Sequence, residues 1–235
     1  MTINSRQTIL DRIQAGTRTV AAEPAQLASA YRAIPRPYTH AGKLDAASRI
    51  ALLIERLREY DAEVVECAPQ DIAATIIAQL AASDKRIFLA PPGLPEEWLA
   101  AGRDAKIDWK IDHDLQANEI DCADGVVTAA FCAVADSGTI VLHHSPAEGR
   151  RVLTLLPDWH LCVLRASQVV ETFPEYFARC PAPPPVVTWI SGPSATADIE
   201  MTRIKGVHGP RFLHVILVHD EQAPAISLEQ LPSLE

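Results

Sequence analysis

Apolar residues recur every three or four positions in several parts of the chain, which predicts amphipathic helices there. The first helix is expected to begin near Asn4 or Ser5, because both residue types are favourable N-caps. The clearest helix is predicted over 43–60, and a further one over 71–82. The apolar positions of the clearest helix are Leu44, Ala47, Ala51, Ile54 and Leu57.

Short runs of β-branched and apolar residues predict strands between and after these helices. They cover 63–66, 86–90, 107–111, 126–128, 138–142, 161–165, 186–190 and 212–218. The stretch 167–179 has helical composition, with Pro174 as an expected break. Because strands alternate with amphipathic helices, the sequence predicts an α/β fold with a mostly parallel sheet flanked by helices.

The domain organisation follows from the same pattern. We predict a helical N-terminal extension over 1–40, a single α/β domain over 41–220 and a C-terminal tail over 221–235. The proline-rich run 181–185 is expected to be a stiff spacer inside that domain. No internal repeat or low-complexity boundary argues for a different division.

Composition and charge exclude several function classes. Hydrophobic residues make up 48% and charged residues 22% of the 235 residues, which is typical of a globular protein. The formal net charge of −9 lacks the basic field of a general nucleic-acid binder, so no nucleic-acid partner is predicted. No run of eighteen apolar residues predicts a membrane span, and the start has no apolar leader, so a cytoplasmic location is expected.

Metal and cofactor motifs are also missing from the sequence. Five cysteines are scattered without a C-x-x-C spacing, so neither a zinc ribbon nor a cysteine-held iron–sulfur cluster is predicted. His143 and His144 are adjacent and would point to opposite faces of a strand. We therefore expect no metal and no cofactor. A metal site assembled from distant residues is the less favoured alternative.

The first segment with candidate chemistry covers 135–139. Asp136 supplies a carboxylate, Ser137 and Thr139 supply hydroxyls, and Gly138 permits an unusual backbone angle or a close approach to a ligand. The alternative is plain turn chemistry, because Asp, Ser and Gly are common turn residues.

The second segment begins at 148 with Glu-Gly-Arg-Arg. Arg150 and Arg151 suit a carboxylate or phosphate ligand, because the guanidinium group forms a bidentate fork of donors. The alternative is a pair of solvated charges on a loop. His160 opens the following strand, either as a ligand contact or as a buried edge histidine.

The third segment leaves a strand at 190. A short helix is predicted over 195–200, capped by Ser191 or Gly192 with Pro193 at its first position. Such a helix start attracts anions. The candidate ligand-binding residues here are Ser191, Gly192, Ser194, Thr196, Asp198 and Glu200. The stretch 192–196 also resembles a nucleophile elbow, but threonine replaces its second glycine, which disfavours a serine hydrolase.

The fourth segment is Gly-Val-His-Gly-Pro-Arg over 206–211. His208 lies between two glycines in a tight turn, and Gly209 and Arg211 complete the candidate set. Ligands of open α/β sheets bind at the carboxyl ends of the strands, so we expect these segments to form a crevice there.

As a set, the four segments resemble the lactate-utilization (LUD) domain family. The motifs are ADSGTIVL at 135–142, EGRR and TLLPDWHLCVLRA within 148–166, ISGPSATADIE at 190–200 and GVHGPR at 206–211. They follow the family's order and spacing. The family's first motif more often reads Glu-Thr-Gly-Thr, and Asp136 and Ser137 keep its charge and its hydroxyl.

The resemblance implies a fold related to the CoA-transferase and sugar-phosphate-isomerase group. It also implies a role in a three-protein bacterial system that oxidises L-lactate to pyruvate, with iron–sulfur oxidoreductases as partner subunits. It assigns no catalytic residue, so the motif positions carry over only as a ligand-binding cleft.

Three functions are then open. The favoured one is a non-redox accessory subunit that binds a small carboxylate or phosphate, its iron–sulfur partners, or both. The second is an autonomous enzyme of the CoA-transferase-like fold acting on a small anionic or nucleotide-like ligand. The third is a sensor or scaffold whose motifs are structural turns.

Overall fold

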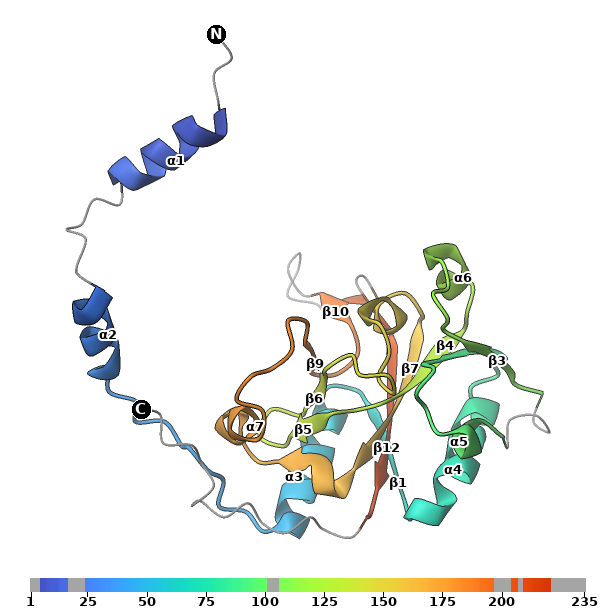
Figure 1. Cartoon of the computed structure of the whole chain (residues 1–235). Coiled ribbons are helices and arrows are strands. Elements are labelled where there is room, and N and C mark those ends of the chain that lie inside the picture. Colours follow the sequence, from blue (N-terminus) through green and yellow to red (C-terminus); the bar gives the residue numbers. More distant parts are fainter. Residues whose placement is uncertain (1–4, 17–23, 101–105, 197–203, 207–208, 221–235) are drawn as a thin grey trace. The chain divides into compact units, whose positions relative to one another are not determined.

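A sheet of six parallel strands forms the centre of the molecule (Figure 1). The computed structural model describes residues 5–16, 24–100, 106–196, 204–206 and 209–220. The strand order is β1-β12-β7-β4-β2-β3, and every neighbouring pair is parallel. The strands are β1 (Glu63–Cys67), β2 (Ile87–Ala90), β3 (Asp108–Ile111), β4 (Gly125–Ala129), β7 (Trp159–Arg165) and β12 (Phe212–Val218).

Both faces of this sheet are covered, so its central strands are apolar almost throughout. Along β12, Leu213, Val215 and Leu217 point to one face and pack with helix α3 (Ala46–Glu59). The alternate residues Ile216 and Val218 point to the other face. There they pack with α4 (Ile72–Ala82) and α5 (Glu96–Ala100).

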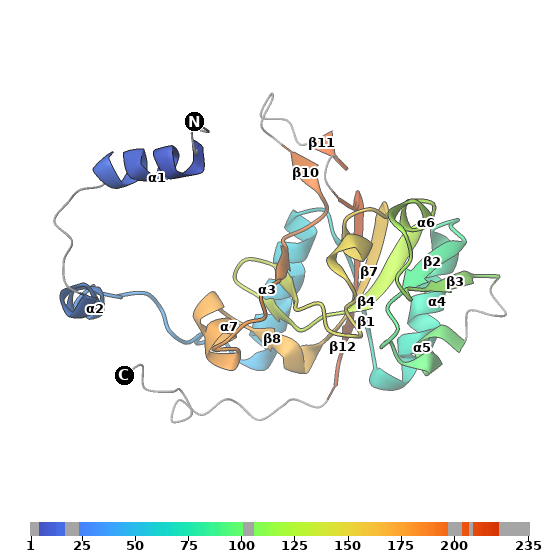
Figure 2. The same cartoon turned by 45° about the horizontal axis from the view of Figure 1, so that its top comes forward.

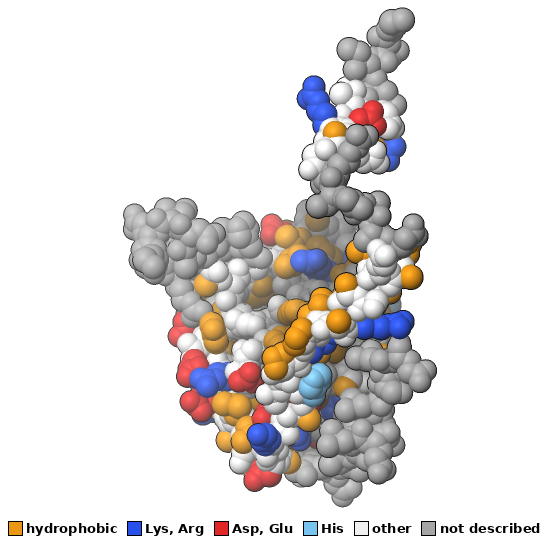
Figure 3. Space-filling model, turned by 90° about the vertical axis from the view of Figure 1, so that its left-hand side faces the viewer, with side chains coloured by type: hydrophobic (Ala, Val, Ile, Leu, Met, Phe, Trp, Pro, Cys, Tyr) orange, Lys and Arg blue, Asp and Glu red, His pale blue; other side chains and the backbone are white. Residues whose placement is uncertain are grey.

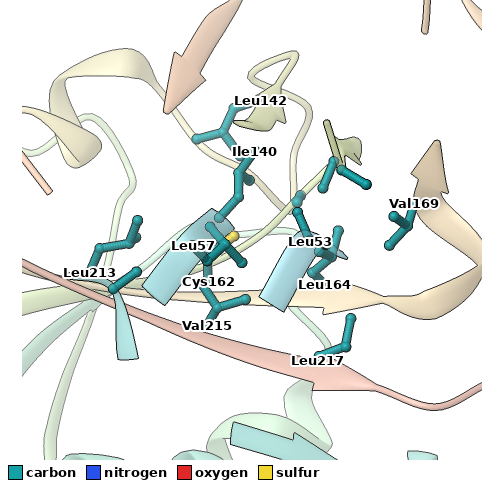
Figure 4. Packing of buried hydrophobic residues seen from close by; sticks show 14 residues of the cluster. Leu53, Leu57, Ile140, Leu142, Cys162, Leu164, Val169, Leu213, Val215 and Leu217 are labelled. Carbon is teal, nitrogen blue, oxygen red and sulfur yellow. The ribbon is translucent and has the colours of Figure 1, made fainter. Parts of the chain in front are cut away.

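Helix α3 lies between the large sheet and a second, four-stranded sheet. The second sheet has the order β8-β5-β6-β9. Figure 4 shows Leu53 and Leu57 of α3 among Ile140 and Leu142 of the small sheet and Val215 of the large sheet. Asp45 caps the helix by accepting a hydrogen bond from the Ser48 amide. The four strands are β5 (Cys132–Val134), β6 (Thr139–Leu142), β8 (Val169–Val170) and β9 (Thr188–Ile190).

Short elements lie between the main strands and helices. β10 pairs with β11 in a small antiparallel ribbon, which is visible in Figure 2. The short helical elements are η1 (Pro69–Asp71), α6 (Ala117–Asp121), η3 (Arg151–Thr154), η4 (Ala166–Gln168) and α7 (Phe173–Arg179), and the ribbon strands are β10 (Ala195–Thr196) and β11 (Ile204–Lys205).

The chain divides into two compact units, 1–38 and 39–235. The first unit contains α1 (Ser5–Gly16) and α2 (Pro24–Arg32), and none of the residues of these two helices is buried. None of the helices in the described ranges is long and apolar enough to cross a membrane.

The predicted fold class is confirmed, because a parallel sheet flanked by helices forms the centre. The helix predicted over 195–200 is wrong at its start: Ala195 and Thr196 form β10, and Pro193 opens no helix. Pro174 is not a helix break. It lies in the first turn of α7, where backbone amides make no hydrogen bond within the helix, so proline's lack of an amide proton costs nothing there. The sequence pattern also missed β5, β8 and α6, which are too short for a periodicity to show.

Candidate functional site

A pocket of about 210 Å³ lies where β9 ends and where β7 and β12 begin. It lies at the carboxyl end of β9 but at the amino ends of the parallel strands β7 and β12, whereas the sequence predicted a crevice at the carboxyl ends. Strand order explains the difference, because β9 belongs to the second sheet and brings its own loop to this edge. The lining residues are Thr154, Leu155, His160, Thr188, Trp189, Ile190, Ser191, Gly192, Pro193, Ser194, Gly209, Pro210 and Leu213.

A chain of three hydroxyl groups joins the first and third predicted segments. The Ser137 and Thr139 hydroxyl oxygens are 2.8 Å apart, and the Thr139 and Ser191 hydroxyl oxygens are also 2.8 Å apart. Antiparallel pairing of β6 with β9 places Ile140 opposite Ile190 and so brings these two loops together. Thr139 is buried, so it fixes the position of the Ser191 hydroxyl at the pocket.

Two glycines of these segments allow the loops to pack against α3. Gly138 has φ +60°, and a Cβ there would lie 2.7 Å from the Cβ of Arg56. Gly192 has φ +86°, and a Cβ there would lie 2.5 Å from the Cβ of Tyr60. Both positions need a left-handed backbone and have no room for a side chain. Their role is to seat the hydroxyl-bearing loops on the end of α3.

His144 connects the wall of the pocket to the loop that follows β6. Its Nδ1 lies 2.9 Å from the carbonyl oxygen of Gly149, and its Nε2 lies 2.8 Å from the hydroxyl of Thr188. The carboxylate of Glu148 is buried and braces the same loop. It accepts hydrogen bonds from the Ser145 hydroxyl at 2.7 Å and from the His143 amide.

His160 lies behind the pocket wall with 1% of its surface exposed. Its Nε2 is 2.8 Å from the hydroxyl of Thr128. Burial lowers the pKa of His160 to about 4, because the interior disfavours the imidazolium. The imidazole is therefore neutral at pH 7. It can take part in hydrogen bonding but cannot supply a positive charge to an anion.

Arg150 is held by a carboxylate rather than turned to the pocket. Its Nε and one terminal nitrogen donate to the two oxygens of Asp112 at 2.7 and 2.5 Å, and the same terminal nitrogen donates to the carbonyl of Leu115. This guanidinium lowers the pKa of the Asp112 carboxyl. Neither Arg150 nor the exposed Arg151 lines the pocket.

Arg211 forms a similar pair with Asp158, in which both guanidinium donors reach the carboxylate at 2.5 and 2.8 Å. The pair ties the residue before β12 to the residue before β7. Gly206, with φ +81°, leaves room for the Arg211 side chain to lie across it.

The remaining candidates differ in whether they lie at the pocket. The Ser194 amide donates to the carbonyl of Pro210 and its carbonyl accepts from the Gly206 amide, so the third and fourth segments meet beside Gly209 in the pocket wall. Asp136 is exposed and is not among the lining residues. Three candidates, Asp198, Glu200 and His208, lie outside the described residues. The side chain of Thr196 also lies outside them.

The sequence analysis missed His144 and Thr188. The sequence predicts His144 on a strand, but β6 ends at Leu142 and His144 has φ +58°. A non-glycine residue with positive φ is uncommon and is found more often at functional sites. No signal in the sequence marks this angle. Within the described ranges, no group of three or more His, Cys, Asp or Glu side chains could hold a metal ion.

Comparison with known proteins places these motifs in a family. The model of the LUD domain matches residues 50–218. The chain belongs to the LUD domain family. The matched range contains the whole six-stranded sheet and all of the pocket residues.

Relatives and one solved structure agree with this membership. "Lactate utilization protein C" of Deinococcus radiodurans is 37% identical over 77% of this chain and 85% of its own length. The protein of the same name from Bacillus subtilis is 32% identical over 54% of this chain and 55% of its own length. A crystal structure of a DUF162 family protein from Deinococcus radiodurans has a TM-score of 0.64 and 34% identity, over 75% of this chain and 99% of that one.

Proposed function

We propose that this LUD-domain protein is a component of bacterial lactate utilization that binds a small carboxylate in the pocket and does not itself transfer electrons. The observation that carries the proposal is convergence: three of the four signature segments supply residues to one pocket. Two relatives named "Lactate utilization protein C" support the process.

The pocket suits a ligand of a few carbon atoms. Its volume of about 210 Å³ is below the usual range for drug-sized ligands, which is about 300–1,000 Å³. The hydroxyl groups of Thr188 and Ser191 can form hydrogen bonds with a small acid, and Leu155 and Leu213 offer apolar contact to its carbon atoms.

An exposed aromatic patch supports docking of a partner subunit. We call Phe177 and Trp189 the α7 patch, because their ring centroids lie 6.3 Å apart and their side chains are 45 and 51% exposed. Trp189 also packs against Phe173 with ring centroids 5.1 Å apart. In Figure 3, hydrophobic side chains (orange) are exposed among charged ones on the face that the view presents. Exposed aromatic side chains are enriched at protein interfaces.

The partners proposed for this patch are iron–sulfur oxidoreductase subunits. The test is affinity purification of the tagged full-length chain from its native cells grown on lactate, with the partners identified by mass spectrometry. We expect iron–sulfur subunits to co-purify. Recovery of the chain alone under these conditions would contradict the partnership.

A pair of variants makes this test specific to the patch. Phe177→Asn removes an exposed aromatic side chain of the patch and should abolish co-purification. Leu156→Asn is the matched control, because Leu156 is also an exposed apolar residue but lies outside the patch. Equal loss of partners in both variants would argue against the α7 patch.

The neutral His160 beside the pocket favours one alternative, an autonomous enzyme that uses this imidazole on the bound ligand. That alternative requires turnover of a small acid by the purified chain alone. It also requires that His160→Gln abolish the turnover while the variant remains folded.

A further inference from the structure

The hydrogen bonds of His144 determine which polar group the pocket wall offers to a ligand. A backbone carbonyl can only accept, so the contact of 2.9 Å between Nδ1 and the Gly149 oxygen requires a proton on Nδ1. In neutral imidazole the other nitrogen is then an acceptor. The Thr188 hydroxyl, 2.8 Å from Nε2, must therefore donate its proton to His144.

This assignment leaves Thr188 with one function toward the pocket. Its only proton is engaged by the imidazole, so the remaining capacity of its oxygen is to accept. Ser191 differs, because either partner can be the donor in its contact with Thr139. Ser191 can thus face a ligand as donor or acceptor, whereas Thr188 can face it only as acceptor.

We infer that the pocket selects a ligand that donates a hydrogen bond to Thr188, namely a hydroxy acid rather than the corresponding keto acid. The inference rests on the proposed function, because it refines the ligand of the same pocket. A keto oxygen has no proton and can only accept, so it could not form a hydrogen bond with the Thr188 oxygen. In this account His144 is a positioning residue, and its positive φ of 58° places the ring between Gly149 and Thr188.

The first experiment needs no ligand. The tautomer of His144 is read from long-range ¹H–¹⁵N spectra of the full chain at pH 8, where an ordinary imidazole is neutral. We expect a protonated Nδ1 and a bare Nε2. Assignment of the signal comes from its loss in His144→Asn, because asparagine tolerates positive φ. A proton on Nε2 would overturn the inference whatever the pocket binds.

The second experiment compares L-lactate with pyruvate by calorimetric titration. We expect the wild-type chain to bind L-lactate about tenfold more tightly than pyruvate, because a site built for a hydrogen bond rejects an analogue that lacks it. Thr188→Val should remove the preference, since valine has the same shape without the hydroxyl. Thr188→Ser should restore it. This rescue separates the hydroxyl's role from a merely structural one.

The outcomes distinguish the two proposals. Binding of both acids with equal affinity, or a preference that survives in Thr188→Val, would overturn the inference while leaving the proposed ligand class intact. Binding of neither acid would contradict the proposed function, and the tautomer of His144 would still decide the chemistry of Thr188.

Discussion

Two kinds of signature segment behave differently in this molecule. The hydroxyl-bearing segment 188–194 lines the pocket, and the contact between Thr139 and Ser191 joins it to the loop at 137–139 behind it. The arginine-bearing segments supply Arg150 and Arg211, and each guanidinium is occupied by a carboxylate of the same chain. A shared motif therefore contains both binding groups and groups that hold the binding loops in place.

The difference teaches that residue type alone does not identify a ligand contact. Arginine is the residue expected to bind an anion, but Asp112 already satisfies the donors of Arg150. Serine and threonine are ordinary turn residues, but here they line the wall of a pocket. We therefore propose 188–194 as the binding region, with the arginine pairs as part of the scaffold.

The largest expected effect comes from separating the hydroxyl-bearing loops from α3. Gly138→Ala should lower the free energy of unfolding by about 3 kcal/mol, because alanine disfavours φ +60° and its Cβ would clash with Arg56. Urea unfolding followed by circular dichroism measures it. Gly209→Ala is the control, since a Cβ there would lie 3.3 Å from the Cβ of Ser194 without positive φ. Equal losses in both variants would show that the α3 contact has no special role.

An effect of comparable size concerns the imidazole behind the pocket. The unfolded chain binds a proton at His160 near pH 6.5, but the folded chain binds it only near pH 4, so acid favours unfolding. The free energy of unfolding should fall by about 3 kcal/mol between pH 6.5 and 4 on account of this residue. In His160→Gln the free energy of unfolding should not show this part of its decrease with falling pH. An unchanged pH profile in the variant would mean that His160 is protonated equally in both states.

The scaffold role of the arginine pair predicts a loss of stability without a loss of affinity. Arg150→Gln should cost about 1–2 kcal/mol at pH 7, because Asp112 would lose its charged partner. The lowered pKa of Asp112 means that this stabilisation is present above about pH 4 and disappears as pH falls through the folded pKa. The difference in the free energy of unfolding between Arg150→Gln and wild type should therefore disappear at acid pH. Arg151→Gln is the exposed control.

The smallest change in stability should accompany the largest change in binding. Ser191→Ala removes an exposed hydroxyl and should alter the free energy of unfolding by less than about 0.5 kcal/mol. Affinity for L-lactate should fall about tenfold, which corresponds to one lost hydrogen bond. Calorimetric titration measures this loss. If Arg150→Gln weakened binding and Ser191→Ala did not, the arginine-bearing segment would be the binding region instead.

Much of the fold was predictable because helices and parallel strands carry a local signal. The apolar spacing over 43–60 corresponds to α3, and the run 212–218 is β12. The ribbon at Ala195 was not predictable from local preference, because it depends on pairing with Lys205 further along the chain. Pro193 after Gly192 predicts a helix start, but the pairing of Ala195 with Lys205 overrides that local preference.

The candidate site was predictable only as a set of residues. Ser191, Gly192, Ser194 and Gly209 line the pocket as the motifs suggested. The partners that decide each role lie far away in the sequence: Thr139 is 52 residues from Ser191, and Asp112 is 38 residues from Arg150. Strand order sets both juxtapositions, and no spacing in the sequence encodes it.

The most direct test of the central claim is an NMR titration of the ¹⁵N-labelled full chain with L-lactate. The account predicts that the largest backbone amide shifts fall in 188–194, with small shifts around Arg150 and Asp112. The largest shifts around Arg150 and Asp112, with none in 188–194, would contradict it and would make the arginine-bearing segment the binding region.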